Sequence, residues 1–185
     1  MARPSILDYL IVMGDARKSS MAPVGSDDAV LLILGSLPGE ASLAAQNYYA
    51  HPQNQFWRLL GAALGEPLAE RAYEERIERL AERGIALWDV VGEALRRGSL
   101  DGALREVRAN PLAEFVERRP RLRSIAFNGR TAARIGRRAL GEVRLRLIDL
   151  PSSSPAYTLP FADKAGQWGV LGELALGAET IKLGR

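Results

Sequence analysis

Short apolar runs recur along the chain and alternate with segments whose apolar residues are spaced at helical intervals. Four runs are typical of strands buried on both faces of a parallel sheet: Ala29–Leu34, Ile85–Val91, Ser124–Phe127 and Leu145–Leu150. Helical spacing covers Phe56–Leu64, Leu68–Arg83, Pro111–Arg119, Thr131–Leu140 and Ala162–Leu176. The alternation predicts an α/β fold in three layers, α/β/α, with a four-stranded parallel sheet between the helices.

The start of the chain differs from the rest. Residues 6–13 form an apolar stretch that is too short to span a bilayer, and no small-residue cleavage pattern follows it. Residues 15–28 are polar and rich in Ser, Gly and Asp. We therefore expect a flexible arm over residues 1–25, a single domain over residues 26–185, and a monomeric protein of the cytoplasm that makes no membrane contact.

Composition narrows the possible chemistry. The chain has no Cys, which excludes disulfides and thiolate chemistry, and its single His argues against a zinc site built from His and Cys. We expect no metal and no cofactor. The net charge is only +3, but Arg residues cluster within 96–97, 118–123, 130–138 and 144–146. Clustered Arg can neutralise phosphates, which favours a nucleic-acid partner; solvated helix faces are the alternative.

The connections that follow the predicted strands are the places where a ligand is expected. In an open parallel sheet the ligand lies beyond the carboxyl ends of the strands. That rule selects the segments Gly35–Asn54, Asp89–Ser99, Asn128–Thr131 and Pro151–Pro160. The first and last are rich in Gly, Pro, Ser, Asn and Tyr, unlike plain connectors.

The segment after the first strand can approach a ligand closely. Its Gly-Ser-Leu-Pro-Gly turn, residues 35–39, combines two glycines and a proline directly after a buried run. It matches neither a dinucleotide fingerprint nor a Walker loop. Tyr48 and Tyr49 follow in a polar stretch, where an aromatic face can hold a flat base; a structural role for both is the alternative.

The segment after the last strand reads Leu-Pro-Ser-Ser-Ser-Pro-Ala-Tyr over residues 150–157. Small hydroxyl residues and main-chain amides at a strand end suit contact with a phosphate backbone. Tyr157 on a proline-braced loop can also act as a wedge in a base stack. A plain turn before a helix is the alternative interpretation.

These two segments resemble motifs of one enzyme family. The stretch from Gly35 to Trp57, with its Tyr-Ala-His-Pro-x-Asn-x-Phe-Trp core, is similar to the first motif of mismatch-specific uracil-DNA glycosylases within the uracil-DNA glycosylase superfamily. The forms Gly-Ser-Leu-Pro-Gly-Glu-Ala-Ser-Leu and Leu-Pro-Ser-Ser-Ser-Pro-Ala most resemble the hypoxanthine (deoxyinosine) DNA glycosylase branch. The resemblance runs from about residue 23 to about residue 174.

The resemblance implies a monofunctional glycosylase that flips a deaminated base, uracil or hypoxanthine, out of DNA and hydrolyses its N-glycosidic bond. It implies catalytic roles for Asn54 and Asn128. It implies base binding by Gly35, Ser36, Leu37, Pro38, Gly39, Tyr49, Phe56 and Asp89. It implies DNA contacts by Ser152, Ser153, Ser154, Pro155, Ala156 and Tyr157.

Several positions depart from the family pattern. Leu37 occupies the place of the Asp or Asn that positions the attacking water in many relatives, and Leu150 that of a His or Asn. Asp89 stands where relatives have a base-reading Asn; an ionised Asp accepts from a ring N–H but cannot donate to a carbonyl. Asn54 does not titrate, so it can orient a water but cannot act as a strong base. Main-chain amides of the 35–39 turn are expected to stabilise charge on the leaving base.

The remaining candidates have structural alternatives. His51 is expected to brace its loop, Glu40 to cap a turn, and the three Trp residues to lie in the core. A serine hydrolase is disfavoured because no Gly-x-Ser-x-Gly elbow is present. Two other functions stay open: a protein that binds damaged DNA without cutting it, and a hydrolase of free nucleosides.

Overall fold

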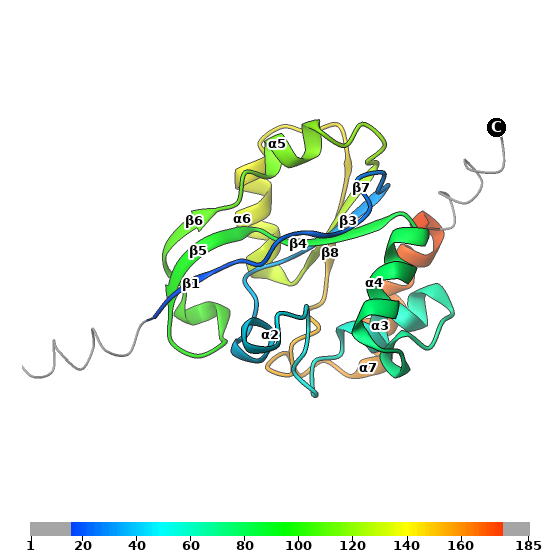
Figure 1. Ribbon diagram of the computed structural model, residues 1–185, viewed down its shortest axis with the longest axis horizontal. Coiled ribbons are helices and arrows are strands. Elements are labelled where there is room, and N and C mark those ends of the chain that lie inside the picture. Colours follow the sequence, from blue (N-terminus) through cyan, green and yellow to red (C-terminus); the bar gives the residue numbers. More distant parts are fainter. Residues whose placement is uncertain (1–15, 176–185) are drawn as a thin grey trace, which may run out of the picture.

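The computed structural model describes residues 16–175, where a five-stranded sheet lies between two groups of helices (Figure 1). Its strand order is β2 (Val24–Gly25), β4 (Ile85–Asp89), β3 (Leu31–Gly35), β7 (Ser124–Asn128) and β8 (Arg146–Leu150). All neighbours are parallel except β2 and β4. The four parallel strands coincide with the four apolar runs, so the predicted α/β/α fold is confirmed, with β2 as an added edge strand.

Helices cover both faces of this sheet. On one face, α3 (Phe56–Leu64), η1 (Leu68–Glu70), α4 (Tyr73–Glu82) and α7 (Phe161–Trp168) pack through an apolar cluster that contains Trp57 and Trp168. On the other, α5 (Leu112–Glu117) and α6 (Arg130–Leu140) pack through a cluster that contains Trp88. The expected burial of the three tryptophans is confirmed.

The helix boundaries follow the sequence pattern with one interruption. The predicted and observed bounds of α3 are the same, whereas the helix expected over Leu68–Arg83 is broken because Ala72 is extended, at ψ 157°. The short helix α2 (Glu40–Ala45) was not predicted. The last predicted helix ends at residue 176, which lies outside the described residues.

A second, antiparallel sheet was also not predicted. It has the order β1 (Ala16–Ser19), β5 (Val91–Arg96) and β6 (Arg105–Ala109). The tip of the β5–β6 hairpin carries η2 (Asp101–Ala103). Residues 16–25, which belong to the predicted arm, form β1 and β2, and residues 1–15 lie outside the described part of the chain. The division into arm and domain stays a prediction.

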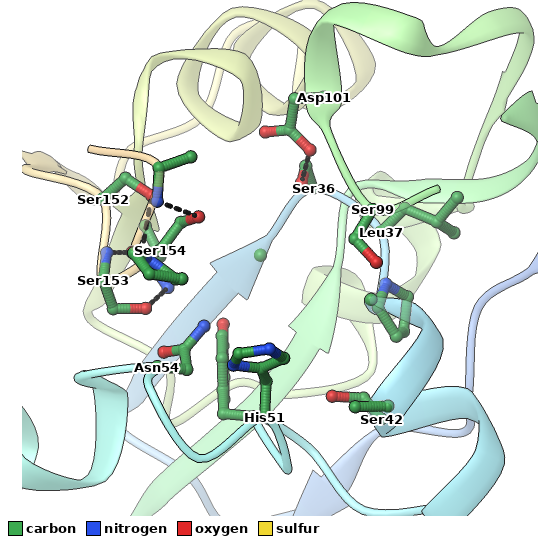
Figure 2. Close-up of a pocket in the computed structure, with 18 of the residues that line it drawn as sticks. Ser36, Leu37, Ser42, His51, Asn54, Ser99, Asp101, Ser152, Ser153 and Ser154 are labelled. Carbon is green, nitrogen blue, oxygen red and sulfur yellow. Dashed lines mark hydrogen bonds between the residues drawn. The ribbon is translucent and has the colours of Figure 1, made fainter. Parts of the chain in front are cut away.

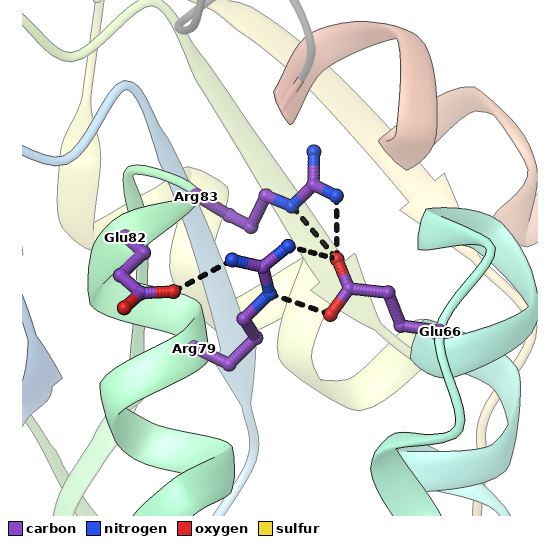
Figure 3. Close-up of polar contacts among 4 residues, drawn as sticks. All are labelled: Glu66, Arg79, Glu82 and Arg83. Atoms are coloured by element: carbon purple, nitrogen blue, oxygen red, sulfur yellow. Dashed lines mark hydrogen bonds and ion pairs between the residues drawn. The ribbon is translucent and has the colours of Figure 1, made fainter.

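An ion cluster fixes α4 to the connection that follows α3 (Figure 3). The Glu66 carboxylate accepts from Arg79 Nε and Nη2 over 2.6 and 2.9 Å, and from Arg83 Nε over 2.8 Å. Arg79 also donates to Glu82 over 2.6 Å. The hydrogen bond from Arg79 is the largest influence that lowers the pKa of Glu66 below its usual range, although burial opposes it. Both Glu66 oxygens are therefore occupied by cationic donors.

Candidate active site

A cavity of about 390 Å³ opens at the carboxyl ends of the parallel strands (Figure 2). All four segments selected from the sequence contribute to its wall: the 35–39 turn and Tyr49 from the first, Asp89 and Ser99 from the second, Asn128 from the third, and residues 152–157 from the last. The Pro-Gly turn and the triple-serine turn therefore meet around one space.

Tyr49 forms an aromatic wall that is supported from behind. Its ring lies parallel to that of Phe56, with centroids 3.7 Å apart and an interplanar angle of 6°. Tyr49 has a left-handed backbone, at φ +57°, and it lines the cavity. Phe56 is fully buried and does not reach the cavity wall, so its expected direct contact with a base is corrected to support of Tyr49.

The floor of the cavity is built on Gly35 and Asp89, at paired positions of β3 and β4. A methyl group at Gly35 would lie 2.8 Å from Asp89 Oδ1 and 3.0 Å from the Tyr49 hydroxyl oxygen. Only glycine therefore leaves this carboxylate oxygen uncovered. Asp89 Oδ2 instead receives hydrogen bonds from the Ser20 and Tyr48 hydroxyls over 3.0 and 3.1 Å.

Burial raises the pKa of Asp89 to about 7, against the hydrogen bonds from Ser20 and Tyr48 that favour its ionised form. Arg96 also lowers this pKa, whereas the charge of Asp101 raises it. The pKa of Tyr48 is raised by burial and by Asp89, so its hydroxyl stays a donor. Asp89 can thus present an acceptor or a donor to a ligand within the physiological pH range.

Asn54 reaches the cavity from the end of the loop before α3. Its Oδ1 accepts the main-chain N–H of Phe56 over 3.0 Å, which supports the first turn of the helix. Figure 2 shows its nitrogen turned toward the cavity. The oxygen is turned to the helix and the nitrogen to the cavity (Figure 2), so the group that Asn54 offers to a ligand is the Nδ2 donor.

Asn128 joins β7 to the serine turn. Its Nδ2 donates to Ser153 Oγ over 2.9 Å, and its Oδ1 accepts the Ser153 N–H over 2.8 Å. The Ser153 carbonyl in turn accepts the N–H of Gln55 over 3.0 Å. Gly129, at φ +99°, permits this approach, since a methyl group there would lie 3.0 Å from Ser152 Cβ. These bonds hold the first and last segments against one another.

Arg96 corrects an expectation from the sequence. Its cluster suggested a phosphate contact, but Arg96 is fully buried and donates to the carbonyl oxygens of Leu37 and Pro38. Its Nε has no hydrogen-bond partner. Burial lowers the pKa of this guanidinium, while Asp101, Glu40 and Asp89 oppose the change. Arg96 therefore fixes the turn at the cavity wall and places a buried positive charge beside it.

The hairpin tip supplies two wall residues that the sequence analysis missed, Leu100 and Asp101, next to Ser99 at the end of a selected segment. Ser99, Leu100 and Asp101 line the cavity. Ser36 Oγ donates to Asp101 Oδ1 over 2.5 Å, and Figure 2 shows this pair on the side of the cavity opposite Asn54. Ser99 Oγ accepts the N–H of Glu40 over 3.0 Å. No local pattern predicted the hairpin, so nothing in the sequence linked these residues to the 35–39 turn.

Two minor candidates have structural partners. His51 Nδ1 accepts the N–H of Gln53 over 3.2 Å, which braces the loop. Glu40 begins α2 and pairs with Lys18 over 2.6 Å. Within residues 16–175, no group of three or more His, Asp or Glu side chains is placed to hold a metal. None of the helices in that range has the length and apolar character needed to cross a bilayer.

The fold and this cavity are those of a DNA glycosylase, an enzyme that hydrolyses the bond between a base and its sugar. A family model described as the uracil DNA glycosylase superfamily matches residues 22–171, and the chain belongs to that superfamily.

The comparisons with individual proteins agree with this family. The chain is 38% identical over 154 residues to a hypoxanthine DNA glycosylase of Methanosarcina acetivorans, covering 82% of this chain and 95% of the relative. It is 39% identical over 114 residues to one of Methanosarcina barkeri, covering 62% and 72%. The solution NMR structure of a candidate uracil DNA glycosylase from M. acetivorans aligns with a TM-score of 0.75 at 36% identity, covering 86% of this chain and 99% of that one.

Proposed function

We propose that this protein is a monofunctional DNA glycosylase that flips out and excises deaminated bases, with hypoxanthine as its main substrate and uracil as a second one. The observation that carries the proposal is a buried carboxylate, Asp89, at the floor of a cavity with an aromatic wall. The hypoxanthine DNA glycosylases among its relatives support the same substrate.

Asp89 discriminates between deaminated and normal bases by the hydrogen that deaminated bases carry on a ring nitrogen. Hypoxanthine and uracil both carry a ring N–H beside a carbonyl, and the open Oδ1 of an ionised Asp89 accepts that hydrogen. Adenine and cytosine present an unprotonated ring nitrogen there, which repels a carboxylate. A base that cannot donate this hydrogen bond leaves the buried carboxylate oxygen unpaired. The free-energy cost of the unpaired group makes the site reject that base strongly.

The other wall residues hold the base while its bond breaks. Stacking on Tyr49 contributes about 1–3 kcal/mol for a base extruded from the helix. Main-chain amides of the 35–39 turn and the Nδ2 of Asn54 face the charge that develops as the base departs. Asn128 acts through Ser153, whose turn closes the opposite side of the cavity.

DNA contacts are proposed around the cavity mouth. The serine turn, residues 152–154, and the following Pro155 and Ala156 offer hydroxyl and main-chain groups to the phosphates. Tyr157 and Leu100 are exposed apolar side chains at the mouth, 38% and 62% accessible, and are placed to fill the space left by a flipped base. We expect the protein to act as a monomer on nucleoid DNA, without metal or cofactor.

The test uses duplexes that contain one hypoxanthine, uracil or xanthine, followed by alkali to break the strand at abasic sites. We expect breaks at the position of hypoxanthine, in the strand that carries it, and none in a duplex with unmodified adenine. Binding to these duplexes without strand breaks would indicate a protein that recognises damaged DNA but does not excise the base. Release of base from free deoxyinosine, with none from DNA, would select a nucleoside hydrolase.

A matched pair of variants tests Asn54. Asn54→Ala removes both the oxygen that accepts the Phe56 N–H and the Nδ2 donor, whereas Asn54→Asp keeps an oxygen for Phe56 and replaces Nδ2 with a charged acceptor oxygen. We expect both variants to lose most turnover while DNA affinity changes little. Near-normal turnover in Asn54→Asp would remove Asn54 from the chemistry.

A further inference from the structure

We propose that Asp101, carried into the cavity by the β5–β6 hairpin, is the carboxylate that activates the attacking water and stabilises the cationic sugar. The inference rests on the glycosylase function proposed above. It assigns a catalytic residue that lies outside the two motifs at the ends of the first and last strands.

The usual places for such a group are filled by residues that cannot accept a proton. Leu37 and Leu150 are apolar and buried. The oxygen of Asn54 accepts a hydrogen bond from the first turn of α3, and the side-chain nitrogen and oxygen of Asn128 are both hydrogen-bonded to Ser153. Hydrolysis still needs an acceptor for the proton of water.

Asp101 has the required position. It lines the cavity, and only its Oδ1 is hydrogen-bonded, to the Ser36 hydroxyl one residue before Leu37. The carboxylate is therefore bonded to the turn that carries Leu37, the residue that replaces the family's polar group. Burial is the main cause that raises the pKa of Tyr49 and of Asp89, and the charge of Asp101 adds to both shifts.

The two cavity carboxylates have different surroundings and suit different tasks. Asp89 is 3% exposed and is held at the floor by Ser20 and Tyr48, where it faces the base. Asp101 is partly exposed at the tip of the hairpin, where water has access. A base reader and a water activator are thus separated by depth in the cavity.

The step balances with water as the only co-reactant. The water oxygen forms a bond to C1′ while the C1′–N bond breaks and leaves its electron pair on the base. The proton of the water moves to the free oxygen of Asp101 and then, through solvent, to the departed base. The products are the neutral base and an abasic sugar with a hydroxyl at C1′.

Asp101→Asn and Ser36→Ala form a matched test. Asparagine keeps an oxygen for the Ser36 hydroxyl but removes the charge, whereas Ser36→Ala removes the hydrogen bond and keeps the charge. We expect the single-turnover rate on hypoxanthine DNA to fall about 100-fold or more in Asp101→Asn and less than about 10-fold in Ser36→Ala. DNA affinity should stay equal or rise in Asp101→Asn, since an anion near the phosphates is lost.

Further measurements distinguish a catalytic role of Asp101 from a structural one. Added formate or azide should restore part of the turnover of Asp101→Ala, because a small anion can occupy the vacated place, and should not help Asn54→Ala. His51→Gln should keep most activity. Equal losses in Ser36→Ala and Asp101→Asn, or an Asp101→Asn rate within about threefold of the parent, would overturn the role of Asp101 and leave the glycosylase intact. A parent protein that cleaves none of the substrates would overturn both proposals.

Discussion

Two groups of charged side chains in this molecule have opposite character. In the Glu66 cluster beside α4, each carboxylate oxygen of Glu66 meets an arginine donor, and the pKa of Glu66 is lowered. In the cavity, Asp89 is buried with one oxygen uncovered, Arg96 has a buried Nε without a partner, and the pKa of Asp89 is raised to about 7. The first arrangement stabilises its charges, and the second keeps them unsatisfied.

The difference between the two clusters indicates that buried charged groups with missing hydrogen-bond partners are the groups available to bind a ligand. A buried charge without a full set of partners costs stability, and the cost is recovered when a ligand supplies the missing hydrogen bond. In the Glu66 cluster both oxygens of the central carboxylate already have arginine donors. The cavity charges still lack some partners, so substitutions should affect stability and activity in different proportions at the two places.

Of all the substitutions in the two clusters, we expect one at Arg96 to have the largest effect on activity and stability. Arg96→Met leaves the carbonyls of Leu37 and Pro38 without their donor and removes the charge that balances Asp89. We expect base excision to fall about 1000-fold or more and the free energy of unfolding to fall by about 3 kcal/mol. Denaturant titration and single-turnover assays measure both. Arg97→Met, the same change at an exposed neighbour, should alter neither by more than a small factor.

Asp89→Asn should separate stability from activity. The folded pKa of Asp89 lies above the unfolded value of 3.8, so its favourable contribution is complete below about pH 4 and is lost as pH rises through about 7. Asparagine does not titrate, and the variant should gain up to about 4 kcal/mol of relative stability by pH 8. Melting temperatures at pH 5 and pH 8 test this shift.

The same variant should lose activity. We expect excision of hypoxanthine to drop roughly 10- to 100-fold at pH 8, because the lost acceptor faced the ring N–H. The parent rate should rise with pH through about 7 as Asp89 ionises. A parent profile that is flat over this range, together with an unchanged rate in Asp89→Asn, would contradict base reading by Asp89.

Glu66→Gln should have the reverse profile. Loss of the carboxylate leaves Arg79 and Arg83 without their shared anion, and we expect about 2 kcal/mol of destabilisation at pH 7 with unchanged turnover. The lowered pKa of Glu66 means that its contribution is present above about pH 4.5 and fades as pH falls below it. Glu82→Gln, at a 63% exposed side chain, is the matched control and should cost under about 0.5 kcal/mol. Reduced turnover in Glu66→Gln would refute the division between the two clusters.

The smallest effect is expected in a groove beside the serine turn. Arg134 lines this groove together with Arg130 and Tyr157. Arg134→Ala should weaken DNA binding about two- to fivefold and reduce the salt dependence by about one phosphate contact, with an unchanged cleavage rate. Arg138→Ala lies on the same helix but outside the groove and should bind DNA like the parent. Equal salt slopes in both variants would exclude a phosphate contact at Arg134.

The parallel sheet and most helices were predictable because burial sets their pattern. β3 is buried at every position, and α3 has five buried residues on its inward side, so both left a clear signal. The ends of these strands then indicated the cavity segments through a general property of parallel sheets. That reasoning located Gly35, Tyr49 and Asn128 correctly at one rim.

The hairpin had no such signal. Every residue of β6 is exposed, so no alternation of apolar and polar positions marked it as a strand. Arg96 was expected at the surface, as a phosphate contact or on a solvated helix face, because burial of an arginine depends on partners that are distant in sequence, here the carbonyls of Leu37 and Pro38. Phe56 was expected to contact the base, but its ring stacks behind Tyr49. This position depends on the conformation of the folded loop, which the sequence pattern does not indicate.

The hairpin strands belong to the small antiparallel sheet, and the tip meets the first segment through the bonds of Asp101 to Ser36 and of Ser99 to Glu40. Insertions or deletions within residues 97–104 would move Ser99, Leu100 and Asp101 as a unit and leave β3 and β7 undisturbed. Evolution could therefore retune substrate range and turnover by editing this one loop while both signature motifs stay unchanged. A group of relatives defined by those two motifs alone would then contain enzymes with quite different substrate specificities.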